Sequence, residues 1–121
     1  MTTITTAAPD VSSLVQGIEG RDGRAVAAWY APDATLTVVD RNHPPSQPQV
    51  FTGTAQIAAL LTDVCSREMT HEVRDLVVTP DRLAFTEHCT YADGTKVLCG
   101  TVATLSHGLI TQQTALQVWD E

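Results

Sequence analysis

Apolar residues recur at helical spacing over the first thirty residues. Asp10 is a good helix-capping residue, and the pattern that follows it ends near Gly20. Its apolar members are Val11, Leu14, Val15 and Ile18. A second helix is expected to begin near Asp22 and to end by Ala31, because Pro32 cannot continue it. Its inward face would carry Val26, Trp29 and Tyr30.

Beyond the proline the spacing changes to that of strands, with one helical interruption. Residues 34–39 are rich in β-branched side chains and predict a first strand. A Pro-rich insertion at 42–49 follows, and then a third helix from near Thr54, with Ile57, Leu60, Leu61 and Val64 on one face. From there only strands are expected, over 70–78, 83–91, 96–105 and 109–119.

Three short turns predict that these last strands form an antiparallel meander. The turns are Thr-Pro-Asp, Ala-Asp-Gly and Ser-His-Gly, and Gly at the left-handed position of the last two suits a three-residue loop closed by a bulge. If the turns hold, the strands pair Glu87 with Cys99, Phe85 with Thr101, Thr101 with Gln113, and Val97 with Gln117.

One face of this predicted sheet is unusually polar for a surface covered by helices. Alternate residues place on it His71, Val73, Phe85, Glu87, Cys89, Cys99, Thr101, Gln113, Ala115, Gln117 and Trp119. A buried polar group without a partner costs roughly 1–3 kcal/mol, so these side chains need either partners or a ligand. The pattern favours a ligand pocket over a dry core.

His71 and Glu87 are the strongest catalytic candidates on this face. The predicted register places His71 opposite Cys89 and one diagonal step from Glu87. An imidazole beside a carboxyl group has the chemistry to move a proton on and off a carbon or a carbonyl oxygen. The alternative interpretation is a structural hydrogen bond that satisfies both groups.

Other polar and aromatic residues extend the candidate site. Asp40, at the end of the first strand, is a third catalytic candidate, although a carboxylate at a strand end is often simply solvated. The expected ligand-binding residues are Trp29, Tyr30, Phe85, Cys99, Thr101, Gln113, Gln117 and Trp119. For the aromatic residues, packing in the core is the alternative.

Composition limits the classes of partner. The 121 residues are 43% hydrophobic, carry a net charge of -7 and have a pI near 4.8. Seven scattered basic residues do not favour nucleic acid or an anionic membrane surface as a partner. Residues 1–9 have neither the basic start nor the apolar run of a signal peptide, so we expect a flexible tail, one domain over 10–121, and a cytoplasmic protein.

The cysteines and histidines match no known cofactor or metal pattern. Three cysteines fit neither a disulfide framework nor a zinc knuckle, and the four histidines lack the short spacing of metal sites. No Gly-rich phosphate loop and no Gly-x-Ser-x-Gly elbow is present. We expect no metal and no cofactor.

Three segments resemble the SnoaL-like group of the nuclear-transport-factor-2-like superfamily, and the resemblance runs from about residue 11 to 121. They are Ala-Pro-Asp-Ala-Thr at 31–35, Phe-Thr-Gly at 51–53, and Gly-Leu-Ile-Thr-Gln-Gln with Gln-Val-Trp-Asp-Glu at the C-terminal end. The resemblance implies an α+β cone in which three N-terminal helices pack on a curved, mainly antiparallel sheet that encloses a pocket. It also suggests a homodimer formed through the outer face of the sheet.

Function follows less directly, because this superfamily contains isomerases, cyclases, dehydratases and non-catalytic proteins. The polar groups of its ketosteroid isomerases are replaced here at the matching positions, which are Leu14, Val38, and Ala103 or Thr101. The resemblance therefore suggests a cofactor-independent acid/base enzyme acting on a small apolar or polyketide-like compound with a different set of residues. The alternative is a non-catalytic ligand-binding or dimerisation module.

Overall fold

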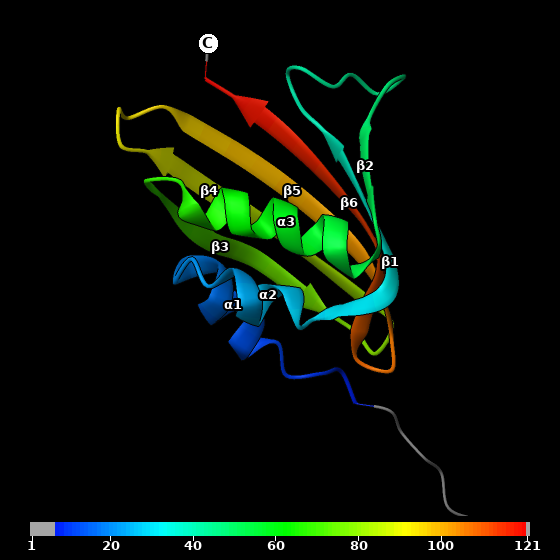
Figure 1. Ribbon diagram of the computed structural model, residues 1–121. Coiled ribbons are helices and arrows are strands. Elements are labelled where there is room, and N and C mark those ends of the chain that lie inside the picture. The colour runs from blue at the N-terminus through cyan, green and yellow to red at the C-terminus, as the bar shows by residue number, and fades with distance from the viewer. Residues whose placement is uncertain (1–6, 121) are drawn as a thin grey trace, which may run out of the picture.

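The structure is a computed structural model that describes residues 7–120, so most of the predicted N-terminal tail lies outside the described residues. It has the expected α+β architecture, with three helices and six strands in the described part (Figure 1). In chain order these are α1 (Ser12–Glu19), α2 (Gly23–Ala27), β1 (Tyr30–Val39), β2 (Gln49–Thr52), α3 (Gly53–Ser66), β3 (Met69–Val78), β4 (Arg82–Tyr91), β5 (Lys96–Ser106) and β6 (Leu109–Trp119).

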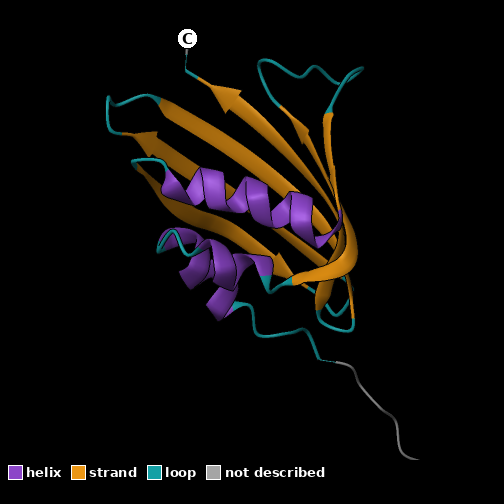
Figure 2. Cartoon of the chain, in the orientation of Figure 1, coloured by secondary structure: helices purple, strands orange, loops and turns teal. Residues whose placement is uncertain are grey.

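The six strands form one curved sheet in the order β2-β1-β6-β5-β4-β3. All neighbours are antiparallel except β1 and β6, which run parallel. The three helices lie together on the concave face, and the opposite face carries none of them (Figure 2). The third helix follows β1 and β2 in the chain, so only two of the three helices are N-terminal as predicted.

The second helix is shorter than its apolar spacing suggests. Asp22 caps it as expected, because its carboxylate accepts a hydrogen bond from the backbone N–H of Ala25 at 3.1 Å. The helix ends at Ala27, however, and Tyr30 already belongs to β1. The reason is sheet pairing: the Trp29 carbonyl accepts from the N–H of Ile110, which ties this segment to β6 before Pro32 is reached.

A strand that the sequence pattern did not reveal begins at the last residue of the Pro-rich insertion. Residues 49–52 form β2, which pairs antiparallel with residues 35–38 of β1. The Val38–Gln49 pair closes the connection at its base, and a backbone bridge between Asp40 and His43 closes a tight turn within it. The four residues of β2 are too few to show a clear strand alternation in the sequence, and three prolines precede them. The strand forms because β1 offers it a free edge.

The predicted register is right for two hairpins and wrong for the last one. Glu87 pairs with Cys99 and Phe85 with Thr101, as expected. Thr101 instead pairs with Ala115, and Val97 pairs with Trp119, so the predicted partners Gln113 and Gln117 were each two residues off. A shift of two keeps every side chain on its predicted face.

The cause of this shift is the turn between β5 and β6. Ser106 pairs with Leu109, which leaves a two-residue turn, and a bulge follows between Thr104 and Leu105. His107 and Gly108 have φ angles of 51° and 77°, the type I′ geometry that suits two-residue hairpins. The tight turn moves the register by one residue relative to the predicted three-residue loop, and the bulge moves it by one more.

Apolar residues bury two sides of the space under the helices. Leu14 and Val26 from the first two helices meet Leu83 and Ile110 of the sheet in one cluster. Ile57 of α3 packs with Leu36 and Val38 of β1 in a second cluster, which also contains Ala31, Ala34, Cys99 and Ala115. In residues 7–120, no helix has the length and hydropathy needed to span a bilayer.

Two glycines of β5 and its turn give a matched test of the turn geometry. Gly108→Ala should destabilise the protein by about 1 kcal/mol, because a Cβ is disfavoured at positive φ. Gly100→Ala is the control, since Gly100 lies in a strand and a Cβ there meets no atom within 4 Å. Urea denaturation measures both variants. Equal stability of the two would contradict the assigned turn.

Candidate functional site

A cavity of about 390 Å³ lies between the helices and the concave face of the sheet. Nearly all the predicted site residues line it: Tyr30, Asp40, His71, Phe85, Glu87, Cys99, Thr101, Gln113, Gln117 and Trp119. Trp29 is the exception, since it packs against the apolar cluster around Leu83 and is not among the residues that line the cavity. The volume falls in the range of small-molecule sites, roughly 300–1,000 Å³.

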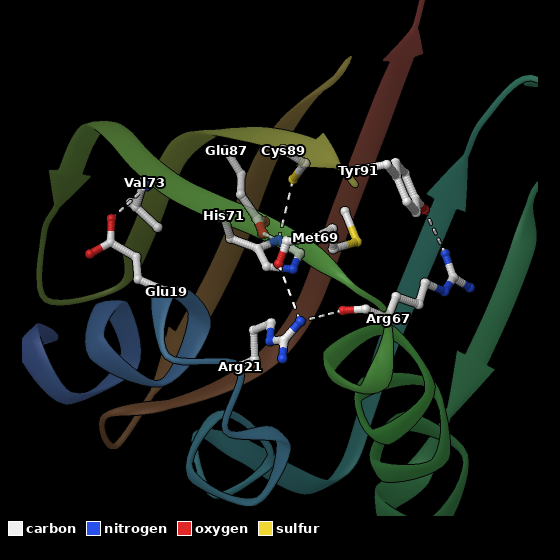
Figure 3. A network of polar contacts seen from close by, with 9 residues as sticks. All are labelled: Glu19, Arg21, Arg67, Met69, His71, Val73, Glu87, Cys89 and Tyr91. Atoms are coloured by element: carbon white, nitrogen blue, oxygen red, sulfur yellow. Dashed lines mark hydrogen bonds and ion pairs between the residues drawn. The ribbon is translucent and has the colours of Figure 1, made fainter. Parts of the chain in front are cut away.

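A hydrogen-bonded pair of ionisable side chains lies on the sheet side of this cavity. The Nδ1 atom of His71 is 2.7 Å from Oε1 of Glu87 and 3.3 Å from Sγ of Cys89 (Figure 3). The His71 side chain is 3% exposed and that of Glu87 18% exposed. The carboxylate is therefore the member of the pair that reaches the open space.

The strand register explains how the two residues meet. His71 of β3 pairs directly with Cys89 of β4, and Glu87 pairs with Val73, so the imidazole and the carboxylate are diagonal neighbours on one face. This geometry is the predicted one. Within the described residues, the Nε2 atom of His71 is buried and has no hydrogen-bond partner. Such an atom marks a place where a polar ligand group or a proton can be accommodated.

Hydrogen bonds from the helices to β3 hold the pair in place. Figure 3 shows Arg21, from the turn after α1, donating to the backbone carbonyl of Arg67 at 2.7 Å and to that of Met69 at 3.5 Å. Glu19 of α1 accepts from the backbone N–H of Val73 at 3.0 Å. The helices are thus fixed to the strand on both sides of His71.

A second polar pair lines the cavity from β1 and β6. The hydroxyl of Tyr30 donates to the side-chain amide oxygen of Gln113. Burial and the nearby Glu87 carboxylate raise the pKa of Tyr30 well above its usual range, so the phenol stays protonated. Because Tyr30 fixes the amide oxygen, the amide N–H₂ group of Gln113 is left as a donor for other partners.

The chemistry of the buried thiols does not favour nucleophilic catalysis. Burial, with Glu87 as the next cause, raises the pKa of Cys99 to about 12, and the same two causes raise the pKa of Cys89 further. Both thiols therefore carry a proton at neutral pH. Cys65 of α3 is only partly buried, and burial also raises its pKa.

The same cluster offers three atoms that a metal ion could use. One ligand atom each from His71, Glu87 and Cys89 lie within 4.8 Å of one another. A metal-bound cysteine must be a thiolate, whereas burial and Glu87 favour the thiol form of Cys89. The short contacts of His71 are those of hydrogen bonds, so the absence of a bound metal stays our prediction.

Exposed residues mark the mouth of the cavity, at the β1–β2 connection and the end of α3. They are Arg41, Asn42, Gln49 and Arg67. Beside them, Asp40 Oδ1 lies 2.8 Å from Nδ1 of His43. Burial opposes ionisation of Asp40, yet hydrogen bonds from His43 and the Asn42 backbone lower its pKa overall. Asp40 is therefore an ionised structural acceptor of the loop.

Aromatic stacking joins the two arginines of the mouth. Tyr91 and Trp119 stack with ring centroids 5.6 Å apart. Arg41 lies over the Trp119 ring at 4.2 Å, and Arg67 donates to the Tyr91 hydroxyl at 3.0 Å. We did not predict either arginine from the sequence. The only available signal was that Arg41 directly follows the candidate Asp40.

The family model of the SnoaL-like domain matches residues 11–113, which is most of the sequence. The chain belongs to the SnoaL-like domain family. This confirms the predicted resemblance and agrees with the cone of helices on a curved sheet. No curated protein matches the sequence.

Solved structures share the fold of this SnoaL-like protein at low sequence identity. A candidate ketosteroid isomerase from Kribbella flavida DSM 17836 is 18% identical, with a TM-score of 0.72, over 90% of this chain and 73% of its own. A protein of unknown function from Mesorhizobium loti, like nuclear transport factor 2, is 16% identical, with a TM-score of 0.72, over 98% of this chain and 100% of its own.

A third neighbour of this kind is a protein of unknown function from Burkholderia xenovorans LB400. It is 16% identical, with a TM-score of 0.73, over 92% of this chain and 80% of its own. At these identities the comparisons show the fold alone. Leu14 and Val38 line the cavity of this chain with apolar side chains, so its polar chemistry lies elsewhere, on β3, β4 and β6.

The thiols give a direct test of the electrostatics of the cavity. At mildly alkaline pH, iodoacetamide should alkylate Cys65 much faster than Cys89 or Cys99, whose raised pKa values and burial leave little thiolate to react. Peptide mass spectrometry over a time course measures the three rates. Protein unfolded in urea is the control, in which the rates should converge. Fast labelling of Cys99 in the native protein would contradict this assignment.

Proposed function

We propose that this SnoaL-like protein binds a small, largely apolar molecule in the cavity and moves a proton on it, as an isomerase, cyclase or dehydratase does. Glu87 is the general base, and His71 holds its carboxyl group in position through their hydrogen bond. The reaction uses only side chains of this chain and no cofactor, and we expect it to take place in the cytoplasm.

The observation that carries this proposal is the buried, hydrogen-bonded His71–Glu87 pair facing a ligand-sized cavity. A carboxylate inside an apolar wall is costly unless a partner holds it, and His71 provides that partner at 2.7 Å. The rest of the surrounding surface is largely apolar, with Leu36, Leu61 and Phe85 among the lining residues. An apolar substrate would exclude water and leave the carboxylate as the available base.

Proton transfer next to a carbonyl also needs a donor for the oxygen that becomes negative. Gln113 fits this role, because Tyr30 holds its amide oxygen and leaves its N–H₂ group free to donate. The buried hydroxyl of Thr101, on the neighbouring strand, is a second neutral donor on the cavity wall. In this assignment Tyr30 is a positioning residue.

Glu87→Gln tests the base. The variant is nearly isosteric, so the fold should persist, but it cannot accept a proton, and turnover should fall by at least about 100-fold. Glu72→Gln is the control, because Glu72 is an exposed carboxylate on β3 that pairs with Arg74. Turnover would be followed by loss of deuterium from substrate labelled beside its carbonyl.

Binding is measured first, by NMR titration of the His71 ring with a panel of small ketones, lactones and polyketide-like compounds. A shift of the His71 signals on adding one compound identifies the substrate class for the assay. Turnover that is unchanged in Glu87→Gln would remove this residue from the mechanism. A panel that leaves His71 unperturbed in the wild type would argue for the structural interpretation of the pair.

A dimer is the second role that a specific observation favours. Five apolar side chains on the outer face of β5, β6 and the end of β3 are 44–67% exposed: Val77, Leu98, Val102, Leu116 and Val118. No helix of the described residues covers this face. Exposed apolar patches of this kind mark interaction surfaces, and we propose that a second copy of the chain covers this one.

Val102→Glu tests the dimer. Val102 is 58% exposed, so a glutamate is tolerated in a monomer but would place two like charges in a symmetric interface. We expect wild-type protein to sediment as a dimer and the variant as a monomer. Thr62→Glu, which adds the same charge on the exposed side of α3, should leave the dimer intact. A monomeric wild type would refute the proposal.

A further inference from the structure

We infer that the ligand of the cavity carries a carboxylate group, which pairs with Arg41 at the mouth. This inference rests on the proposed function and adds the class of substrate: an apolar organic acid whose hydrocarbon body enters the cavity. It is carried by the position of Arg41, by the state of its charged neighbours, and by the spacing of the mouth from the His71–Glu87 pair.

Arg41 is held in place but its hydrogen-bonding groups are free. The guanidinium lies 4.2 Å from the centroid of the Trp119 ring, which fixes the side chain over a lining residue of the cavity. Among the described residues, no carboxylate forms a salt bridge with Arg41 and no acceptor takes a hydrogen bond from its side chain. A guanidinium offers several N–H donors in a planar fork that matches the two oxygens of a carboxylate.

The neighbouring charged residues are already paired, which makes Arg41 the available charge at the mouth. Arg67 also lines the cavity, but its Nη2 atom is 2.6 Å from a carboxylate oxygen of Asp63 and its Nη1 donates to Tyr91. Asp40 is engaged by His43 at 2.8 Å. One free positive charge beside a paired carboxylate suits a singly charged anion better than a phosphate dianion.

The arrangement also fixes which way the ligand enters. Trp119 pairs with Val97, and Val97 pairs with Cys89, the strand neighbour of His71. Two steps between strands separate Trp119 from Cys89, or about 10 Å. A carboxylate at the His71–Glu87 end would meet the like charge of Glu87, so the acid group belongs at Arg41. The reacting carbon would then lie at the opposite end of the ligand from the carboxylate.

The test compares acids with their uncharged amides. The probes are phenylacetate, 4-phenylbutyrate and 1-naphthylacetate, each with its primary amide, titrated by calorimetry and by NMR of the His71 ring and the Trp119 indole. Wild-type protein should bind the best acid roughly tenfold more tightly than its amide. Arg41→Gln should remove this preference and leave amide binding unchanged. Arg24→Gln, which removes an exposed charge from α2, is the control and should keep the preference.

The outcomes distinguish failure of the carboxylate inference from failure of the proposal that the cavity binds a small molecule. Amides that bind as tightly as their acids, or an acid preference that survives in Arg41→Gln, would overturn the carboxylate inference and leave the proposed binding cavity intact. If no acid and no amide perturbs either His71 or Trp119, the carboxylate inference and the binding proposal both fail. Matching thermal unfolding curves for the three proteins would show that a lost preference reflects lost charge.

Discussion

The hydrogen bond between His71 and Glu87 is the interaction on which the interior of this protein depends. It places an ionisable pair on a sheet face that most proteins fill with aliphatic side chains, and the rest of the structure accommodates that pair. Arg21 and Glu19 fix the helices to β3 beside it. The cavity above it stays large enough for a small molecule, at about 390 Å³.

Sequence patterns predicted this face well because alternation in a strand is a property of the backbone itself. His71 and Glu87 were placed together by counting along one hairpin. Even the two-residue error in the β5–β6 pairing left the correct side chains on the cavity face. The failures have a common physical origin in contacts between distant segments. Tyr30 was assigned to a helix because its pairing with Ile110 cannot be seen locally, and β2 exists only because β1 offers it an edge.

The mouth of the cavity could not be predicted for the same reason. Arg41 and Trp119 are almost eighty residues apart in the chain, and only the parallel pairing of β1 with β6 brings their segments together. Shared fold did not supply the missing information, since the solved structures compared above are only 16–18% identical in sequence. The activity of such a domain has to be argued from the side chains of its own cavity.

The backbone bridge between Asp40 and His43 has a consequence for how this protein can change over evolution. It closes a tight turn at Arg41 and Asn42, and the Val38–Gln49 pair closes the whole β1–β2 connection, so the residues between them form a separately anchored flap. Insertions, deletions or substitutions in that flap would alter the entrance of the cavity while the strands that carry His71 and Glu87 keep their register. Selection or protein engineering can thus reshape the mouth of the cavity by exchanging one surface segment, with the side chains of its interior left in place.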